Sequence, residues 1–365
     1  MSTLPSGAAG PSPSAGTTAG PPDIVRTAYA ELVVTDLARA RAFWVDLLGF
    51  VVSEEDADAL YLRGYEELVH HSLILRRGPA TACGRIGFRV RTPDDLDRAV
   101  AWYGARSCPV RRIPAGTTPG LGEAVRAQDP LGFTVELVHE MAKVERLIQR
   151  YDLRRGASIS RIDHVNIAVP DVPAAYAYYT DLGFGLSETI EDADGTLYAA
   201  WMFRKQTVHD VAFTLGAGPK LHHLGFAVPE SHHILSLCDT IGALDVAHHI
   251  ERGPGRHGVS NAFYVYLRDD DGHRVEIYTS DYFTGDPDHE PLRWDVHDER
   301  RRDFWANPVV PSWYLGSAPI LDLDGRPVPV VEQEPTERTV TVGADGHGTV
   351  VHQPPAARQP EGADV

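Results

Sequence analysis

The residue types that could do chemistry in this chain centre on a carboxylate in an apolar strand. Glu276 lies between Val275 and Ile277, after an alternating run and a D-D-D-G turn, which is the pattern of a β-hairpin. An unpaired charge buried in such a strand would be costly, so Glu276 needs a partner. Two histidines in other strand-like segments, His164 and His223, could hold a metal ion together with it.

Two neutral imidazoles and one carboxylate on one face of a metal ion leave about three coordination positions open. This arrangement suits a non-haem Fe(II) centre that activates dioxygen, and Mn(II) tolerates the same geometry. Zinc with histidine and glutamate ligands is a competing assignment. The open positions matter because dioxygen and an organic substrate could bind side by side while the metal transfers electrons between them.

An internal repeat supports this choice of ligands. The segment A-Y-A-E-L-V-V-T-D-L at 28–37 matches D-H-V-N-I-A-V-P-D-V at 163–172, and each copy continues into the same order of strands and helices. At the matched positions the first copy has Tyr29, Arg85 and Glu136, whereas the second copy has the His, His and Glu set. We therefore expect the metal in the second copy only.

The repeat predicts an α+β fold of tandem βαβββ modules in two pseudo-repeat domains. We expect a metal-free N-terminal domain at 23–142 and a catalytic, metal-binding domain at 159–285. Residues 1–22 are rich in Ser, Gly, Ala, Pro and Thr, which is typical of a disordered leader. The pattern at 143–158 predicts a short helical linker, and 286–365 form a C-terminal extension.

Length and composition narrow the class of protein. The 365 residues suffice for two or three domains, and the net charge of −17 argues against nucleic-acid binding. No apolar run reaches transmembrane length, and the N-terminus lacks the pattern of a secretory signal. The three cysteines are widely spaced, so we expect neither a disulfide framework nor a thiolate metal site. A cytoplasmic protein without nucleic-acid or membrane partners is the favoured interpretation.

A third histidine and the hairpin itself offer further reactive groups. His209 could act as a general acid or base, because an unperturbed imidazole titrates near neutrality. A solvated loop histidine beside Asp210 is the simpler alternative. His257 and Tyr266 lie on the loop and strand that precede Glu276, so they could reach the open face of the metal. Turn packing for the first and core packing for the second are the alternatives.

Three arginines could bind an anionic substrate tail. Arg252, Arg301 and Arg302 each carry a planar guanidinium that can hold a carboxylate through two hydrogen bonds. Most arginines instead lie on a solvated surface, and the run R-R-R-D at 300–303 includes at least one such residue.

These residues lie within motifs that resemble the extradiol catechol dioxygenases of the vicinal oxygen chelate superfamily. The motifs are H-V-N at 164–166, T-V-H-D at 207–210, H-H at 222–223, R-G-P-G-R-H-G-V-S-N-A-F-Y at 252–264 and H-R-V-E-I-Y at 273–278. Two later segments, at 294–314 and 339–346, are similar to the members of the family that cleave 3,4-dihydroxyphenylacetate. The resemblance runs from about residue 23 to residue 346.

The resemblance implies a role for each candidate residue. The metal ligands would be His164, His223 and Glu276, and His209 would be the acid/base that assists O2 activation and proton transfer. The substrate and oxygen pocket would be formed by Asn166, Trp201, His257 and Tyr266, with Arg252 and Arg302 facing the substrate carboxylate and Tyr278 close to the metal. The resemblance also implies one Fe(II) or Mn(II) per subunit, a homotetramer, and a C-terminal segment that forms a lid over the site.

Other functions stay open from the sequence. The chain could be an extradiol dioxygenase of a different catechol, or a glyoxalase- or epimerase-like metalloenzyme of the same fold. Sites of the latter kind often draw ligands from both halves of a repeat, which Tyr29 and Arg85 disfavour. A third possibility is a binding module that sequesters small anions without metal, in which case His164→Ala would leave ligand affinity unchanged.

Overall fold

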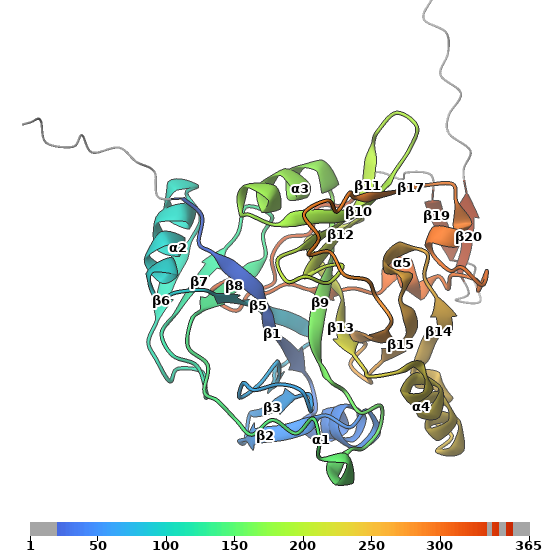
Figure 1. Cartoon of the computed structure of the whole chain (residues 1–365), viewed down its shortest axis with the longest axis horizontal. Helices are drawn as coiled ribbons and strands as arrows, with labels where there is room; N and C mark the ends of the chain where they lie inside the picture. Colours follow the sequence, from blue (N-terminus) through green and yellow to red (C-terminus); the bar gives the residue numbers. More distant parts are fainter. Residues whose placement is uncertain (1–19, 334–337, 343–347, 353–365) are drawn as a thin grey trace, which may run out of the picture.

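The computed structural model describes residues 20–333, 338–342 and 348–352, and it consists of two halves built from the same order of elements (Figure 1). The first half comprises β1 (Ile24–Val34), α1 (Leu37–Arg41) continued by a π-helical turn (Ala42–Leu47), β2 (Val51–Glu55), β3 (Ala59–Arg63), β4 (Leu73–Arg77), β5 (Ala82–Val90), α2 (Asp94–Ala105), β6 (Val110–Ile113), β7 (Ala124–Gln128) and β8 (Thr134–Val138). The second half comprises β9 (Arg161–Val169), α3 (Val172–Asp181), β10 (Gly185–Glu191), β11 (Leu197–Phe203), β12 (Val211–Leu215), β13 (Lys220–Ala227), α4 (Ser231–Ala243), β14 (Ile250–Arg256), β15 (Phe263–Arg268) and β16 (Arg274–Thr279). Residues 1–19 of the expected leader lie outside the described residues.

Each half forms one mixed sheet, and the two sheets have matching strand orders. The first runs β2-β3-β4-β1-β5-β8-β7-β6, and the second, written in the matching direction, runs β10-β11-β12-β9-β13-β16-β15-β14. In the second sheet, β17 (Leu292–Asp295) adds to the edge strand β10, and β18 (Ala318–Pro319) pairs with β13. β1 pairs antiparallel with β5, and its counterpart β9 pairs antiparallel with β13. Segments that repeat in sequence therefore hold equivalent places, and the predicted fold of tandem βαβββ modules is confirmed.

The first helix of each half begins at an aspartate cap directly after the strand that leads into it. The side chain of Asp36 accepts hydrogen bonds from the N–H groups of Ala38 (2.8 Å) and Arg39 (3.1 Å). Asp171, at the matched position, accepts one from Ala174 (2.8 Å). These caps place the end of the strand and the start of the helix at matched residues in both halves.

The two halves meet where β1 lies beside β9 in the middle of the molecule (Figure 1). The N–H of Thr27 donates to the carboxylate of Asp210 (2.7 Å), and the Thr27 hydroxyl donates to the Asp210 carbonyl (3.0 Å). At another point of the junction, Nε1–H of Trp44 donates to the carboxylate of Asp269 (3.0 Å). A single cluster of buried apolar side chains runs through both halves, so the metal-binding half is anchored on its partner.

The segment at 143–158 is not the helical linker that the sequence predicted. Its helical part, within the described residues, is the single 3-10 turn Tyr151–Leu153. The backbone is used in tertiary contacts instead: the N–H of Leu147, for example, donates to the carbonyl of Tyr65 (2.9 Å). Contacts of this kind with the first half override the helical pattern of the sequence.

After β16 the chain returns across the second half. It contains β17, a 3-10 turn (Glu299–Arg301), α5 (Ser312–Leu315), β18 and a hairpin of β19 (Arg338–Val342) with β20 (Gly348–His352). Residues 334–337, 343–347 and 353–365 of the expected extension lie outside the described residues. Within the described part of the chain, no helix combines the length and apolar character needed to cross a membrane.

Candidate metal centre

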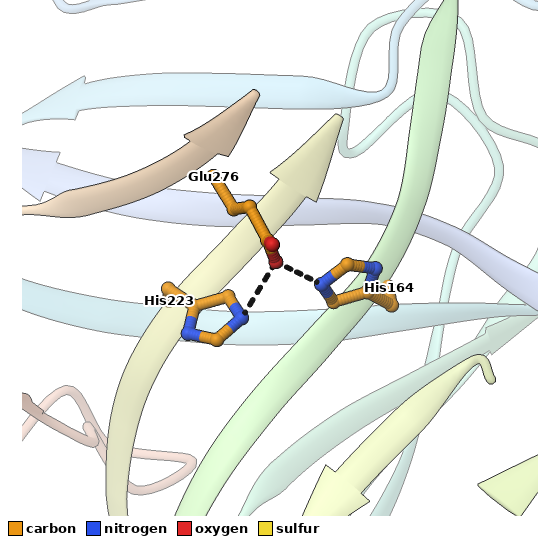
Figure 2. Close-up of side chains that lie close together, drawn as sticks. All are labelled: His164, His223 and Glu276. Carbon is orange, nitrogen blue, oxygen red and sulfur yellow. Dashed lines mark hydrogen bonds and ion pairs between the residues drawn. The ribbon is translucent and has the colours of Figure 1, made fainter. Parts of the chain in front are cut away.

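His164, His223 and Glu276 point toward one another from three neighbouring strands, β9, β13 and β16 (Figure 2). Nε2 of His164 lies 2.9 Å from Oε2 of Glu276, and Nε2 of His223 lies 3.3 Å from the same oxygen. One ligand atom from each residue lies within 4.8 Å of the other two, and all three side chains are buried. The structure therefore brings the predicted ligands together, while their role as ligands stays a prediction.

Strand register and one glycine create this convergence. Gly225 on β13 lies opposite Glu276 on one side and opposite His164 on the other, so all three residues face the same way. His223, two residues before Gly225, shares that face because side chains alternate along a strand. A Cβ at Gly225 would lie 2.1 Å from Cε1 of His164, so the missing side chain leaves the space that the imidazole fills.

The chemistry of the donors fits Fe(II) or Mn(II). Nδ1 of His164 lies 3.1 Å from the carboxylate of Asp163, and Nε2 lies 2.9 Å from that of Glu276. Burial lowers the pKa of His164, but hydrogen bonds to these two carboxylates raise it to about 9. A metal ion bound at Nε2 would replace the hydrogen on that nitrogen, while Asp163 would keep accepting the hydrogen on Nδ1. Burial raises the pKa of Glu276, but hydrogen bonds from His164 and His223 hold it well below its usual range, so this carboxyl is ionised. Two imidazoles and one carboxylate, held on one side, are the donor set typical of a non-haem iron site.

His209 lies directly against a metal-ligand candidate. The ring centroids of His209 and His164 are 3.9 Å apart, with the planes tilted by 33°. Burial lowers the pKa of His209 well below its usual range, and the charge of His164 lowers it further. Its Nδ1 is buried and has no hydrogen-bond partner among the described residues. A neutral imidazole with an uncommitted nitrogen can take up a proton and release it again.

A cavity of about 110 Å³ opens at this centre. Of the predicted site, its lining contains Asn166, Trp201, His209, His223, Arg252, His257, Tyr266, Glu276, Arg301 and Arg302. Nε2 of His257 lies 2.9 Å from the hydroxyl of Tyr266 and 3.5 Å from Oε1 of Glu276. Tyr278 packs on the remaining ligand candidate, with its ring centroid 5.3 Å from that of His164. The structure thus gathers the predicted pocket residues around one space, and their individual roles stay predictions.

Arg252 is a buried cation without a carboxylate partner in the described part of the chain. One of its amino groups donates to the carbonyl of Arg302 (2.9 Å), and the guanidinium lies over the ring of Trp313, 4.7 Å from its centroid. Its Nε has no hydrogen-bond partner among the described residues. The side chain of Arg302, by contrast, pairs with Glu299 (2.9 Å). Because a buried cation without a counter-charge is costly, Arg252 is the better placed of the two to bind an anionic group.

Two residues at the site were not singled out from the sequence. Nζ of Lys205 donates to the carbonyl of Asp163 (2.8 Å) and to that of His209, and so ties the loop before β12 to the strand that carries His164. The carbonyl of Trp313 lies 2.9 Å from Nε2 of His222, which brings the C-terminal segment on to the cavity. Trp313 falls within the 294–314 motif, but only tertiary contacts give it a place.

In the first half, the place that corresponds to the candidate metal centre is filled by arginine side chains. The hydroxyl of Tyr29 donates to Glu136, and Nε of Arg85 lies 3.2 Å from the Tyr29 hydroxyl and 3.6 Å from Glu136. Arg126 also pairs with Glu136 (2.5 Å). Burial raises the pKa of Glu136, but these two guanidinium groups bring it below its usual value. The carboxylate is therefore balanced by side chains, and the described residues give no support for a site that draws metal ligands from both halves.

With this geometry in view, the chain belongs to the glyoxalase/bleomycin resistance protein/dioxygenase superfamily, whose family model matches residues 26–137 and 161–277. Within the superfamily it is similar to homoprotocatechuate 2,3-dioxygenases of known structure. The enzyme of Arthrobacter globiformis is 55% identical, with a TM-score of 0.85 over 86% of this chain and 98% of that one. The Brevibacterium fuscum enzyme, in complex with 3,4-dihydroxyphenylacetate, is 54% identical with a TM-score of 0.85, over 86% of this chain and 99% of its own.

Curated relatives are more distant in sequence and name related activities. A manganese-dependent 2,3-dihydroxybiphenyl 1,2-dioxygenase of Geobacillus genomosp. 3 is 29% identical over 78% of this chain and 95% of its own length. A metapyrocatechase of Pseudomonas sp. (strain CF600) is 29% identical over 80% of this chain and 97% of its own. The resemblance to extradiol dioxygenases that the motifs indicated is confirmed.

Proposed function

We propose that the protein is an extradiol ring-cleaving dioxygenase that inserts both atoms of O2 into 3,4-dihydroxyphenylacetate, giving 5-carboxymethyl-2-hydroxymuconate semialdehyde in aromatic catabolism. The observation that carries the proposal is one cavity whose lining contains both two members of the candidate metal set, His223 and Glu276, and the uncompensated cation of Arg252. The first feature supports activation of O2, and the second supports a substrate with an anionic tail. The similarity to homoprotocatechuate 2,3-dioxygenases supports the same substrate.

The metal would be held by His164, His223 and Glu276. When bound, Fe(II) or Mn(II) supplies the open coordination positions and the electron transfer that allow O2 to react with a catechol. Asp163 keeps the His164 ring in the orientation that presents Nε2 to the metal. His209 lies against that ring, and burial lowers its pKa so that the imidazole is neutral; one of its nitrogens can then take a proton from the substrate hydroxyl and return it during ring opening.

The rest of the cavity would bind and orient the substrate. We assign the carboxylate of the substrate to Arg252, with Arg302 beside it. The hydrogen-bonded pair of His257 and Tyr266 lies next to Glu276 and would orient the reacting part of the ring. Asn166 and Trp201 complete the lining, and the C-terminal segment around Trp313 would exclude water as a lid.

The test is anaerobic addition of 3,4-dihydroxyphenylacetate to protein loaded with Fe(II) or Mn(II), followed by O2. We expect a yellow ring-fission product and uptake of one O2 per product, without an external reductant. A parallel sample with 4-methylcatechol separates two failures. Product from the uncharged catechol alone would reassign the substrate, whereas bound metal without product from either compound would refute extradiol cleavage.

We also propose that the protein works as a homotetramer in the cytoplasm, with domains at 23–142 and 159–285 and with 286–365 as the extension that covers the site. The repeat of sheet topology supports the domain limits, and the contact of Trp313 with His222 supports the cover. The tetramer rests on the resemblance to the dioxygenase family. Light scattering on the purified protein tests it, and a monomeric mass would refute it.

A further inference from the structure

A second group of metal-binding side chains lies outside the catalytic cavity. Within the described residues, two groups of His, Cys, Asp or Glu bring one ligand atom from each of three residues within 4.8 Å of one another. One is the catalytic set. The other consists of His248 and His249, in a 3-10 turn after α4, and Asp270, in the turn between β15 and β16. The two groups share no residue and have the same kinds of donor, two imidazoles and a carboxylate.

The hydrogen bonding of His249 leaves one ring nitrogen available to a metal ion. Its Nδ1 lies 2.7 Å from the carbonyl oxygen of Arg268, and a carbonyl can only accept, so Nδ1 carries the hydrogen. In the neutral ring Nε2 then holds the lone pair. Histidine ligands of protein metal sites almost always donate their other N–H to a carbonyl or carboxylate in this way. The ring is buried against Phe43, with centroids 4.9 Å apart, so its direction is fixed.

The other two donors are free to adjust. His248 and Asp270 are exposed, so their side chains can turn toward an ion without disturbing the core. The ring centroids of His248 and His249 are already 4.2 Å apart. One fixed donor and two adjustable donors suit a four-coordinate ion completed by water, at the ligand distances of about 2.0–2.2 Å that zinc requires.

We propose that His248, His249 and Asp270 form a second, peripheral site for a divalent transition metal of the zinc class. Hard cations such as Ca²⁺ favour sites made of oxygen donors, which excludes them here. For mixed nitrogen and oxygen donors, zinc binds more tightly than manganese or iron. Zinc is therefore the ion with which we probe the peripheral site, and manganese is counted in the same samples because the catalytic set has the same kinds of donor.

The position of the site indicates what an ion would do there. It would join the chain after α4 to the turn between β15 and β16. Asp269, the neighbour of Asp270 in that turn, accepts the hydrogen bond from Trp44 of the first half. His249 touches Phe43 of the same half. A bound ion would therefore stabilise the two segments of the second half that contact Phe43 and Trp44 of the first half. Because the ion would bind the folded protein, it would raise the melting temperature.

The chain offers a matched control. His232 and His233 on α4 are also adjacent histidines, with ring centroids 4.0 Å apart, and His232 lies 3.2 Å from Glu230. That group does not bring three ligand atoms within the same limit among the described residues. If zinc merely binds to paired surface histidines, His232→Ala and His248→Ala will behave alike.

The experiment is a zinc titration of manganese-loaded protein against a chromophoric chelator, with manganese and zinc counted in the same samples. We expect wild type and His232→Ala to bind one zinc more than His248→Ala, and to gain melting temperature that His248→Ala does not gain. Asp270→Asn is a second variant at an exposed position, and we expect it to weaken zinc binding at least about tenfold. Equal zinc content in wild type and both site variants, or an equal loss in His232→Ala, would overturn the proposal.

Discussion

The glycine beneath the His164 ring provides a sharp test of the metal centre. Gly225 faces His164 across the β9–β13 pair, and its backbone needs no positive φ, so only space prevents a side chain there. In Gly225→Ala, the new Cβ would lie 2.1 Å from Cε1 and 2.3 Å from Nε2 of His164. Non-bonded carbon atoms normally approach no closer than about 3.5 Å, so the imidazole must move by about 1 Å or more.

This displacement is large compared with what a metal site tolerates. Ligand distances in protein metal sites lie within about 0.2 Å of their preferred values, so His164 cannot remain a ligand after such a shift. Changes to residues that only support a ligand already weaken metal binding by about 10- to 100-fold, and we expect Gly225→Ala to exceed that range. The overpacking itself should destabilise the fold by about 1–3 kcal/mol.

The sequence repeat supplies the control for this variant. Gly87 holds the matched position in the first half, and a Cβ there would lie 2.1 Å from Cε1 of Tyr29. We expect Gly87→Ala to cost similar stability and to leave metal affinity unchanged, because no metal ligand is displaced. Chelator competition measures affinity, and chemical denaturation measures stability. Wild-type metal affinity in folded Gly225→Ala would refute the role of His164, and an equal loss in Gly87→Ala would show a global effect.

Three further outcomes are expected. His209→Asn should keep the metal and lose about 10²- to 10⁴-fold in turnover, measured as kcat with metal content as control; near wild-type rates across the pH profile would exclude proton transfer by this residue. Arg252→Ala should raise KM for 3,4-dihydroxyphenylacetate about 10- to 100-fold more than KM for 4-methylcatechol, and more than Arg302→Ala does; equal effects on both substrates would exclude a carboxylate contact. Burial raises the pKa of Asp129 to about 7, above its unfolded value, so its contribution to stability is complete below about pH 4 and is lost as the pH rises to 7. Asp129→Asn keeps the acceptor for the N–H groups of the turn, so urea denaturation should show the stability of the variant rising relative to wild type by about 3 kcal/mol from pH 5 to pH 8; a constant difference would show that the pKa is not raised.

The repeat made the fold predictable from sequence, and it also predicted which three side chains would converge in the second half. Matched strands have matched registers, so comparison of Tyr29 with His164 singled out the place where the two halves differ in chemistry. The helical expectation for 143–158 was wrong because the backbone of that segment is used by contacts with the first half, which local pattern cannot express. Lys205 lay beyond prediction for the same reason, since it acts through two carbonyls that the fold alone brings together.

In the first half, the arginine beside Glu136 makes the charge balance of that carboxylate independent of any bound ion. Arg85 is part of the chain, so the charge opposite Glu136 is present from synthesis onward and does not depend on cellular supply. Under the proposed function, Glu276 would rely on an exchangeable ion for the same purpose. Loss of that ion would therefore leave the charge balance of the first half unchanged. The second half could then take up a new ion while it stays anchored on the first half, because the hydrogen bonds between Thr27 and Asp210 involve none of the candidate ligands.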